Sequence, residues 1–280
     1  MIKTYPVPDP AIALRSLIRQ VDSHKGLYGN VAVIGGANSM IGAALLAGRA
    51  ALKHGTGKVS IGLLNDNFQV DPEQPELMVY KSKRLIKNTS LTHILLGPGL
   101  GQSKKANTLL EMCLRTNKPL IIDADGLNLI SKSLKLQLLL KHRQAETIIT
   151  PHPMEAARLL QCDTSDIQKN RPVAIMKLQS IFQCGVILKG HDTLVLGNNS
   201  KLFQNNTGNS ALSSAGQGDV LGGIILALWA QGLSLIEACC CGVYIHGKAA
   251  DTWRISNSER IGLTATETIE FSRCCLNNYL

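Results

Sequence analysis

The sequence predicts an α/β fold with a mainly parallel central sheet that is covered by helices on both faces. Short apolar strands alternate with helical segments along most of the 280 residues. The strands are mainly apolar, as expected where both faces of a parallel sheet are buried. The chain also contains 25 glycines, and several stand where a strand ends, which indicates tight turns.

The predicted elements follow one another from residue 30 onward. Most of the strands are apolar runs followed by glycine, proline or a charged residue. The strands cover residues 30–34, 59–64, 93–96, 119–122, 147–150 and 186–188, followed by a hairpin of 193–196 and 201–204 around residues 197–199. Small or apolar residues at helical spacing predict helices over 41–52, 106–115, 220–230, 234–251 and 265–276. No linker or repeat interrupts this order, so we expect one domain over residues 1–280.

Composition narrows the class of ligand. The net charge is +9 and the pI is near 9.2, but the lysines and arginines are scattered in short clusters. Aromatic residues make up only 4% of the chain, so few side chains are available to stack on bases. The charge therefore suits small anionic ligands, and we expect no nucleic-acid partner.

The eight cysteines include no Cys-x-x-Cys pair, which argues against a zinc site or a thioredoxin-like motif. They are typical of small apolar residues in a reducing compartment. The N-terminus carries no signal peptide, and no apolar run reaches the roughly 18 residues of a membrane span. We therefore expect a cytoplasmic protein with no membrane partner.

The most informative segment runs from Gly208 to Gly223. It places Asp219 directly behind Gly216 and Gly218, at the start of an apolar helix. Glycines allow successive N–H groups to point into one concavity, and the helix N-terminus adds partial positive charge. An anion site beside a carboxylate base suits phosphoryl transfer from a nucleotide to an alcohol. By itself, the motif is more typical of a helix-capping turn.

Further polar and glycine residues follow the other predicted strands. Because ligands collect at the carboxyl ends of parallel strands, we expect these residues to meet at one edge of the sheet. They are Gly35-Gly36, Gly97 to Gly101, Asp123 and Asp125, His152 and Glu155, and Lys189. This convergence is what favours a binding site over a set of unrelated turns.

Each of these features also has a purely structural explanation. Glu155 is favoured in the first turn of a helix by the helix dipole, but it could also hold Mg²⁺ through water. Of Asp123 and Asp125, one is expected to cap a helix and the other to contact a polar ligand, and the sequence does not say which is which. The segment from Lys189 to Thr193 is either a hairpin turn or a nucleotide cradle. His93 and His246 lie in apolar runs and are expected to be satisfied core residues.

Three common site motifs are absent from the sequence. The glycines near residue 36 do not form Gly-x-Gly-x-x-Gly, so a standard nicotinamide-binding Rossmann site is excluded. There is no Walker loop and no Gly-x-Ser-x-Gly nucleophile elbow.

Taken in order, these motifs resemble the ADP-dependent NAD(P)H-hydrate dehydratase family, a branch of the ribokinase-like fold, in its stand-alone form. The resemblance covers about nine-tenths of the chain, from His24 to the last helix. It is carried by Gly35-Gly-Ala-Asn38, Gly97-Pro-Gly-Leu-Gly101, Asp123-Ala-Asp-Gly-Leu-Asn128, Thr150-Pro-His-Pro-Met-Glu-Ala-Ala-Arg-Leu159, Lys189-Gly190 with Thr193, and Gly208-Asn209 through Gly216-Gln-Gly-Asp219. It implies a three-layer α/β/α sandwich.

The resemblance implies repair of NADHX and NADPHX, the hydrated and redox-inactive forms of NADH and NADPH, acting on the S epimer. The terminal phosphoryl group of ADP, or of ATP, would pass to the ring hydroxyl and then leave as phosphate. Asp219 would be the general base, and Mg²⁺ would be bound near Glu155. The other implied roles are substrate contacts at Ala43, Gly101, His152 and Asp219, nucleotide contacts at Lys189, Gly190, His191, Asp192, Thr193 and Gly218, and an anion hole at Gly216, Gln217 and Gly218. A homotetramer is also implied.

The sequence departs from the family pattern at a few positions. Gln217 stands where threonine or methionine is common, and Gly126 stands where alanine is usual, which is expected to loosen that helix cap by up to about 1 kcal/mol. His191 and Asp192 replace small residues.

Two alternatives stay open on the sequence. One is a ribokinase-like small-molecule kinase, such as a hydroxyethylthiazole or hydroxymethylpyrimidine kinase, which would release a phosphorylated product. The other is a nucleotide sensor without turnover. His152 favours the dehydratase, because those kinases tend to have asparagine there.

Overall fold

A ten-stranded sheet forms the centre of the computed structural model, which describes residues 2–65, 67–198, 200–258 and 260–280. The strand order is β1-β10-β9-β8-β7-β6-β5-β2-β3-β4. The strands are β1 (Tyr5–Pro6), β2 (Asn30–Gly35), β3 (Lys58–Leu63), β4 (Met78–Lys81), β5 (His93–Leu96), β6 (Leu120–Ile122), β7 (Thr147–Ile149), β8 (Gly185–Leu188), β9 (Leu194–Leu196) and β10 (Phe203–Gln204).

The sheet is mainly parallel, as predicted. Every pairing from β4 across to β8 is parallel, and β9 is antiparallel to both of its neighbours. From β2 the chain runs outward through β3 to β4, then returns to β5 on the other side of β2 and continues to β8. The strand order therefore reverses between β2 and β5, and such a switch point opens a crevice at the carboxyl ends of the two strands.

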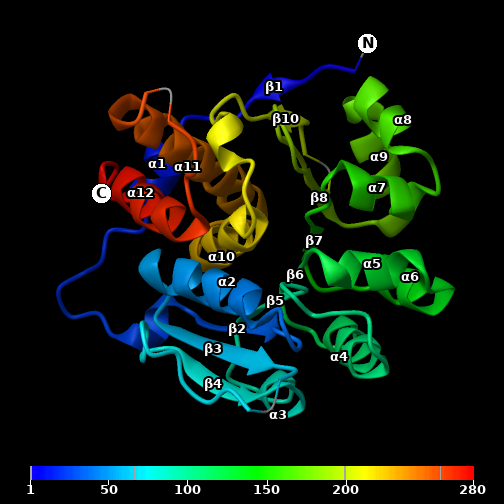
Figure 1. Ribbon diagram of the computed structural model, residues 1–280, viewed down its shortest axis with the longest axis horizontal. Helices are drawn as coiled ribbons and strands as arrows, with labels where there is room; N and C mark the ends of the chain where they lie inside the picture. Colours follow the sequence, from blue (N-terminus) through cyan, green and yellow to red (C-terminus); the bar gives the residue numbers. More distant parts are fainter. Residues whose placement is uncertain (1, 66, 199, 259) are drawn as a thin grey trace.

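Helices cover both faces of the sheet and make three layers (Figure 1). One face packs against α1 (Ala11–Arg15), α2 (Ile41–Lys53), α10 (Gln217–Ala230), α11 (Leu235–Ser256) and α12 (Ala265–Asn277). The other face carries α3 (Ser82–Ile86), α4 (Lys104–Leu114), α5 (Asp125–Ser131), α6 (Leu134–Lys141), α7 (Pro153–Leu160), α8 (Thr164–Lys169) and α9 (Arg171–Phe182). Two 3₁₀ helices, η1 (Lys25–Tyr28) and η2 (Ser210–Leu212), complete the description.

Alternate side chains of each strand enter different cores. In β2, Val31 and Val33 lie in the core under α2 and α10, while Ala32 and Ile34 lie in the core under α4 and α5. All four side chains are fully buried. A two-sided core is the physical reason that the strands are mainly apolar, because successive side chains point to opposite faces and both faces exclude water.

Helices α2 and α10 pack unusually closely, and this contact holds the start of α10 over the switch point. A Cβ added at Gly223 would lie 2.2 Å from the carbonyl oxygen of Ala47 and 2.8 Å from the Cβ of Ala50. Any side chain at this position would push the two helices apart.

The predicted strands and helices are all present, with bounds that move by a few residues. The largest shift at a helix start is in α10, which begins at Gln217 instead of Val220, so Asp219 lies in its first turn. The hairpin is formed by β9 and β10, although its predicted turn includes Asn199, which lies outside the described residues. The sequence pattern did not reveal β1, β4, α1, α3, α6, α8 or α9, most of which are short.

Gly126 has a packing role that the prediction of a looser helix cap missed. A Cβ there would lie 2.7 Å from Cγ2 of Ile122 and 3.0 Å from Cδ2 of Leu96. These branched side chains occupy the space that an alanine would need, so the glycine is matched to its neighbours.

The close helix contact predicts the effect of one substitution. Gly223→Ala should lower the free energy of unfolding by about 1–3 kcal/mol, because the new methyl group has no room. Gly42→Ala in α2 is the matched control, since no atom lies within 4 Å of its added Cβ. The control should stabilise the protein by up to about 1 kcal/mol, because alanine favours helix. Urea denaturation measures both values, and equal effects would refute the packing argument.

Candidate functional site

The predicted residues do meet at one edge of the sheet, where the carboxyl ends of β2, β5, β6, β7 and β8 lie side by side. A series of backbone bonds links these strand ends. Gly97 donates its N–H to the Ile34 oxygen (3.0 Å), and Asp123 donates to the Leu96 oxygen (3.0 Å). Thr150 donates to the Ile122 oxygen (3.1 Å), and Lys189 donates to the Pro151 oxygen (2.9 Å).

Two glycine loops meet at the switch point. Gly36 donates its N–H to the Pro98 oxygen (2.9 Å), and Ala37 donates to the Gly99 oxygen (2.7 Å). A Cβ at Gly35 would lie 1.9 Å from the Pro98 oxygen, so only glycine allows this approach.

Ala43 and Gly101, two of the predicted substrate contacts, lie beside these loops. The Cβ of Ala43 is 3.2 Å from the position that a Cβ on Gly99 would take. Gly101 has a φ of 69° and donates its N–H to Oδ2 of Asp125 (2.8 Å). Asp125 therefore fixes the second glycine loop, which explains the carboxylate at the start of α5.

Asp123 and Lys189 form an ion pair at the centre of the site. Nζ of Lys189 lies 2.6 Å from Oδ1 of Asp123, and the two side chains are 16% and 2% exposed. Burial lowers the pKa of Lys189, but the carboxylates of Asp123 and Glu155 outweigh it, so the pKa is raised overall. Lys189 is thus a fixed cation among carboxylates.

Asp219 projects from the first turn of α10 into the same group of charges. Burial raises its pKa to about 7, and the negative charge of Asp123 adds to this effect. Within the described part of the chain its carboxylate makes no hydrogen bond or ion pair. A carboxylate with a pKa near neutrality and free oxygens is suited to accept a proton from a bound hydroxyl.

The start of α10 is left open for an anion. Its N-cap is Gly216, with a φ of 86°, and no side chain caps the helix. A Cβ at Gly218 would lie 3.3 Å from Nζ of Lys189, so a glycine keeps the lysine close to the helix N-terminus. Gln217 turns its side chain toward Ser214 (3.0 Å) and is buried, which leaves its backbone N–H as the group for an anion hole.

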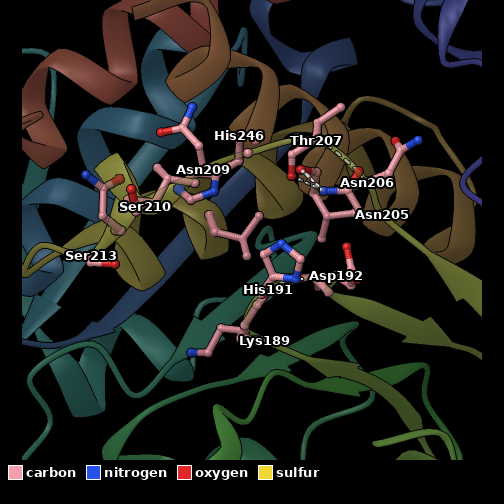
Figure 2. Close-up of a pocket in the computed structure, with 18 of the residues that line it drawn as sticks. Lys189, His191, Asp192, Asn205, Asn206, Thr207, Asn209, Ser210, Ser213 and His246 are labelled. Carbon is pink, nitrogen blue, oxygen red and sulfur yellow. Dashed lines mark hydrogen bonds and ion pairs between the residues drawn. The ribbon is translucent and has the colours of Figure 1, made fainter. Parts of the chain in front are cut away.

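A cavity of about 430 Å³ opens next to this helix start. Figure 2 shows Lys189, His191 and Asp192 on one side of it, across from His246 and the loop that contains Asn209. The cavity is lined by the whole predicted nucleotide segment, which is Lys189, Gly190, His191, Asp192 and Thr193. Gln217 and Gly218 at the start of α10 also line the cavity. The hairpin explanation is confirmed, because the segment is the turn between the antiparallel strands β8 and β9. The nucleotide cradle stays a prediction.

The remaining predicted residues do not line this cavity. The wall of the cavity does not include the following predicted residues: Gly216, Asp219, Ala43, Gly101 and His152. Lys189 contacts both regions, since it lines the cavity and binds Asp123 among the strand ends. The arrangement is therefore two adjoining regions that meet at Lys189 and the start of α10.

His152 and Glu155 form a capping box at the start of α7. Nδ1 of His152 accepts from the N–H of Met154 (3.1 Å) and Glu155 (3.3 Å), and Oε2 of Glu155 accepts from the His152 N–H (2.8 Å). Nε2 of His152 lies 3.3 Å from Oε1 of Glu155, and the His152 side chain is partly exposed. Burial lowers the pKa of His152 and raises that of Glu155 to about 7. The structural explanation of Glu155 is therefore confirmed.

The described residues contain no group of three or more His, Cys, Asp or Glu side chains arranged to hold a metal ion. Glu155 already uses Oε2 in the capping box, so a direct bond from that atom to a metal would compete with it. The oxygen donors near Lys189 nevertheless suit Mg²⁺ that arrives with nucleotide phosphates, because such ions keep several waters and need few protein ligands.

Sequence reasoning gave no role to one wall of the cavity, although it had singled out the segment that begins at Gly208. Asn205, Thr207, Gly208 and Asn209 line it, and their loop is bound to α11, where Asp251 accepts from the Gly208 N–H and from Nδ2 of Asn209 (both 3.0 Å). This polar run follows β10, and its place directly after a strand was the signal that could have revealed it.

The prediction for the two apolar-run histidines was partly wrong. His246 lines the cavity, and burial lowers its pKa to about 4, so the ring is neutral. His93 packs edge-on against Trp229, with ring centroids 4.9 Å apart. One nitrogen of each ring, Nδ1 of His93 and Nε2 of His246, is buried without a hydrogen-bond partner among the described residues, so the prediction of satisfied histidines is not confirmed.

Two further findings concern the class of protein. No helix among the described residues is long and apolar enough to cross a membrane. All eight cysteines are free, and six of them are buried.

Known proteins with similar sequences belong to the family that the motifs resemble. The NAD(P)H-hydrate dehydratase family model matches residues 31–272. The chain is 41% identical over 263 residues to the ADP-dependent (S)-NAD(P)H-hydrate dehydratase of Neisseria meningitidis serogroup B, covering 92% of this chain and 88% of that protein.

Solved structures show the same fold. The Bacillus subtilis ADP/ATP-dependent NAD(P)H-hydrate dehydratase, co-crystallized with ATP/Mg²⁺, superposes with a TM-score of 0.83 at 28% identity, over 98% of this chain and 99% of that one. A ribokinase-like superfamily protein from Enterococcus faecalis gives a TM-score of 0.82 at 27% identity, over 96% and 94%. The ribokinase-like three-layer fold is therefore confirmed.

The raised pKa of Asp219 predicts a pH-dependent stability. The folded state holds this proton more tightly than the unfolded chain, where the ordinary pKa is 3.8. The stabilising contribution is thus complete below about pH 4 and is lost as the pH rises toward about 7. Asp219→Asn should therefore raise the melting temperature at pH 8 and change it little near pH 4. Asp166→Asn, an exposed control in α8, should show no such pattern in the same thermal scans. An Asp219→Asn gain that is equal at both pH values would contradict the argument.

Proposed function

Because the chain belongs to the NAD(P)H-hydrate dehydratase family, we propose that it is an ADP-dependent (S)-NAD(P)H-hydrate dehydratase. It would return hydrated, redox-inactive NADHX and NADPHX to NADH and NADPH, with ADP converted to AMP and phosphate. The observation that carries this proposal is the position of Asp219, a free carboxylate with a pKa near 7 at an uncapped helix start beside the cavity.

The cavity is assigned to the nucleotide. Its wall combines the hairpin turn at residues 189–193 with the start of α10, so the phosphates would face Lys189 and the free amides of Gln217 and Gly218. The polar loop at residues 205–209 lies across the cavity and offers hydrogen bonds to the sugar and the base. A volume of about 430 Å³ is in the usual range for a small-molecule site.

The hydrated nicotinamide is assigned to the strand ends beside Lys189. Ala43 and Gly101 at the switch point and His152 at the start of α7 would surround it, with its ring hydroxyl directed at Asp219. This places the hydroxyl between the base and the terminal phosphoryl group, as in-line transfer requires.

The reaction follows from these positions. Asp219 accepts the hydroxyl proton while the hydroxyl oxygen attacks the terminal phosphorus, and AMP leaves. Amides at Gly216–Gly218 and the Lys189 ammonium stabilise the charge on the phosphoryl oxygens. The ring nitrogen lone pair then expels phosphate, and loss of a proton from the neighbouring carbon restores the dihydropyridine. Phosphorylation is needed because hydroxide is a poor leaving group and phosphate is a good one.

Mg²⁺ is the expected companion of the nucleotide, and Glu155 would contact it through water. When bound it would neutralise phosphate charge. The amount of negative charge near Lys189 supports this proposal, because Asp123, Asp125, Asp219 and Glu155 face a single buried lysine. ATP is a second possible phosphoryl donor.

A ribokinase-like kinase would use the same base and anion hole but release a phosphorylated product. The named relatives at up to 41% identity favour the dehydratase over that reaction. A nucleotide sensor without turnover would not need a carboxylate poised near neutral pKa. The reaction product distinguishes the three proposals: a dehydratase gives NADH or NADPH with phosphate, a kinase gives a phosphorylated product, and a sensor gives no product.

The assembly and location remain parts of the proposal. A homotetramer is expected, and light scattering on the purified protein measures it. Repair of reduced nicotinamide cofactors suits the cytoplasm, and free cysteines agree with that compartment. The partners are the two small-molecule substrates, without nucleic acid.

The first test of function is direct. Purified protein with ADP, Mg²⁺ and chemically hydrated NADH should restore the near-ultraviolet absorbance of the dihydropyridine, with equimolar AMP and phosphate. Asp219→Asn should cut this turnover by about 10²–10⁴-fold while sparing nucleotide affinity, as expected for loss of a general base. No turnover by the unaltered protein with ADP or ATP would refute the dehydratase, and a phosphorylated product would favour the kinase.

The second test concerns the nucleotide site. Lys189→Met should weaken ADP binding by about 10- to 100-fold, because a charge-assisted hydrogen bond contributes about 1.5–3 kcal/mol. Lys177→Met removes an exposed charge on α9 and should leave the affinity unchanged. Titration calorimetry on folded variants measures both. Equal affinities for the two variants would exclude Lys189 as a phosphate contact.

A further inference from the structure

Asp123 is a buried carboxylate with an unusual set of contacts. Its Oδ1 accepts from Nζ of Lys189 (2.6 Å) and from the N–H of Ala124 (2.8 Å). Its Oδ2 lies 3.8 Å from the position that a Cβ on Gly218 would take. One side chain at the end of β6 therefore reaches the hairpin after β8 and the first turn of α10.

The backbone around Asp123 is strained and firmly held. Ala124 has a φ of 50° and a ψ of −118°, which a residue with a Cβ rarely adopts. A Cβ at Gly97 would lie 1.9 Å from the backbone carbonyl oxygen of Asp123. The same carbonyl oxygen accepts a hydrogen bond from the Gly126 N–H (2.9 Å). These two contacts hold the main chain, and the Asp123 carboxylate adds a third through the Ala124 N–H. None of the three involves Lys189, so the backbone does not need the ion pair to keep its place.

A stabilising role alone explains the pair poorly. Burial of two charges costs about as much free energy as their attraction returns, and apolar residues often replace such pairs without loss. The cation of this pair lines the nucleotide cavity, and its anion lies beside the start of α10. The pair is thus located where the two regions of the site meet.

We propose that Asp123 is a positioning residue of the reaction, which holds the Lys189 ammonium between the nucleotide cavity and Asp219. The inference rests on the proposed function and deepens it. Lys189 is then in place before the nucleotide arrives. Its side chain therefore loses little conformational entropy when the nucleotide binds. Asp123 also adds a fixed negative charge beside the base, which makes Asp219 hold its proton more tightly than burial alone would.

The charges that act on Asp219 give the sign of this second effect. Asp123, Asp125 and Glu155 raise its pKa, and Lys189 lowers it. His152, at the start of α7, interacts with both Asp123 and Lys189. Removal of the Asp123 charge takes away a carboxylate and leaves Lys189 without its partner, free to approach Asp219. Both changes lower the pKa of Asp219, so the base would remain ionised to lower pH.

The test compares two substitutions at one position. Asp123→Asn keeps the shape and an oxygen acceptor for the Ala124 N–H but removes the charge. The acidic limb of the kcat/KM profile should move down by roughly one pH unit, and KM for ADP should rise about tenfold. Asp123→Glu keeps the charge and should keep the limb near its original pH, even where turnover falls. Urea denaturation shows that each variant is folded.

Carbon-13 NMR titration of the aspartate carboxyls gives the same comparison without turnover. The Asp219 signal, assigned with Asp219→Asn, should titrate at lower pH in Asp123→Asn than in the unaltered protein. If Asp123→Asn does not fold, Asp123→Glu carries the test: an acidic limb or Asp219 titration displaced despite the retained charge overturns the proposal.

For a folded Asp123→Asn, an unmoved acidic limb with a uniform loss of activity overturns the proposal and leaves a structural role. An unmoved Asp219 titration overturns it also when the protein shows no repair activity. Failure of the unaltered protein to turn over hydrated NADH refutes the proposed function alone, so the two failures are distinguishable.

Discussion

The close approach of two backbone loops at the split between β2 and β5 is the constraint on which the site depends. The loops bond through Gly36 and Ala37, and Gly35 leaves room for the Pro98 oxygen. Gly97 then allows the Asp123 backbone to approach, which begins a chain of strand-end contacts that continues to Lys189. Because each contact is between main-chain atoms, the carboxyl ends of five strands form one rigid edge.

The rigid edge permits an electrostatic arrangement that would otherwise be unfavourable. Several carboxylates surround Lys189, and burial raises the pKa of Asp219 and of Glu155 to about 7. Such groups reduce stability near neutral pH, and the two apolar cores beneath them supply the compensating free energy. The same desolvation that costs stability makes Asp219 a stronger base, so stability and reactivity trade against each other at one residue.

The sequence was sufficient to predict the layers, the parallel strands and the convergence of polar residues at one edge. These depend on local patterns: apolar strands, strand-end glycines and an aspartate at the start of an apolar helix. The role of Asp123 could not be predicted, because its partner Lys189 is 66 residues away and only the strand order brings them together. The parts of the cavity wall at residues 205–207 and at His246 were missed for the same reason, since α11 and the loop after β10 meet only in the folded chain.

The central claim is that a phosphoryl group passes to the ring hydroxyl, with Asp219 as its base, before the carbon–oxygen bond breaks. Hydrated NADH prepared in oxygen-18 water carries the label in that hydroxyl, and mass spectrometry of the released phosphate follows it through one turnover with ADP. The account predicts one labelled oxygen in phosphate and none in water, because the hydroxyl oxygen departs attached to phosphorus. Unlabelled phosphate, with the label in water, would contradict it.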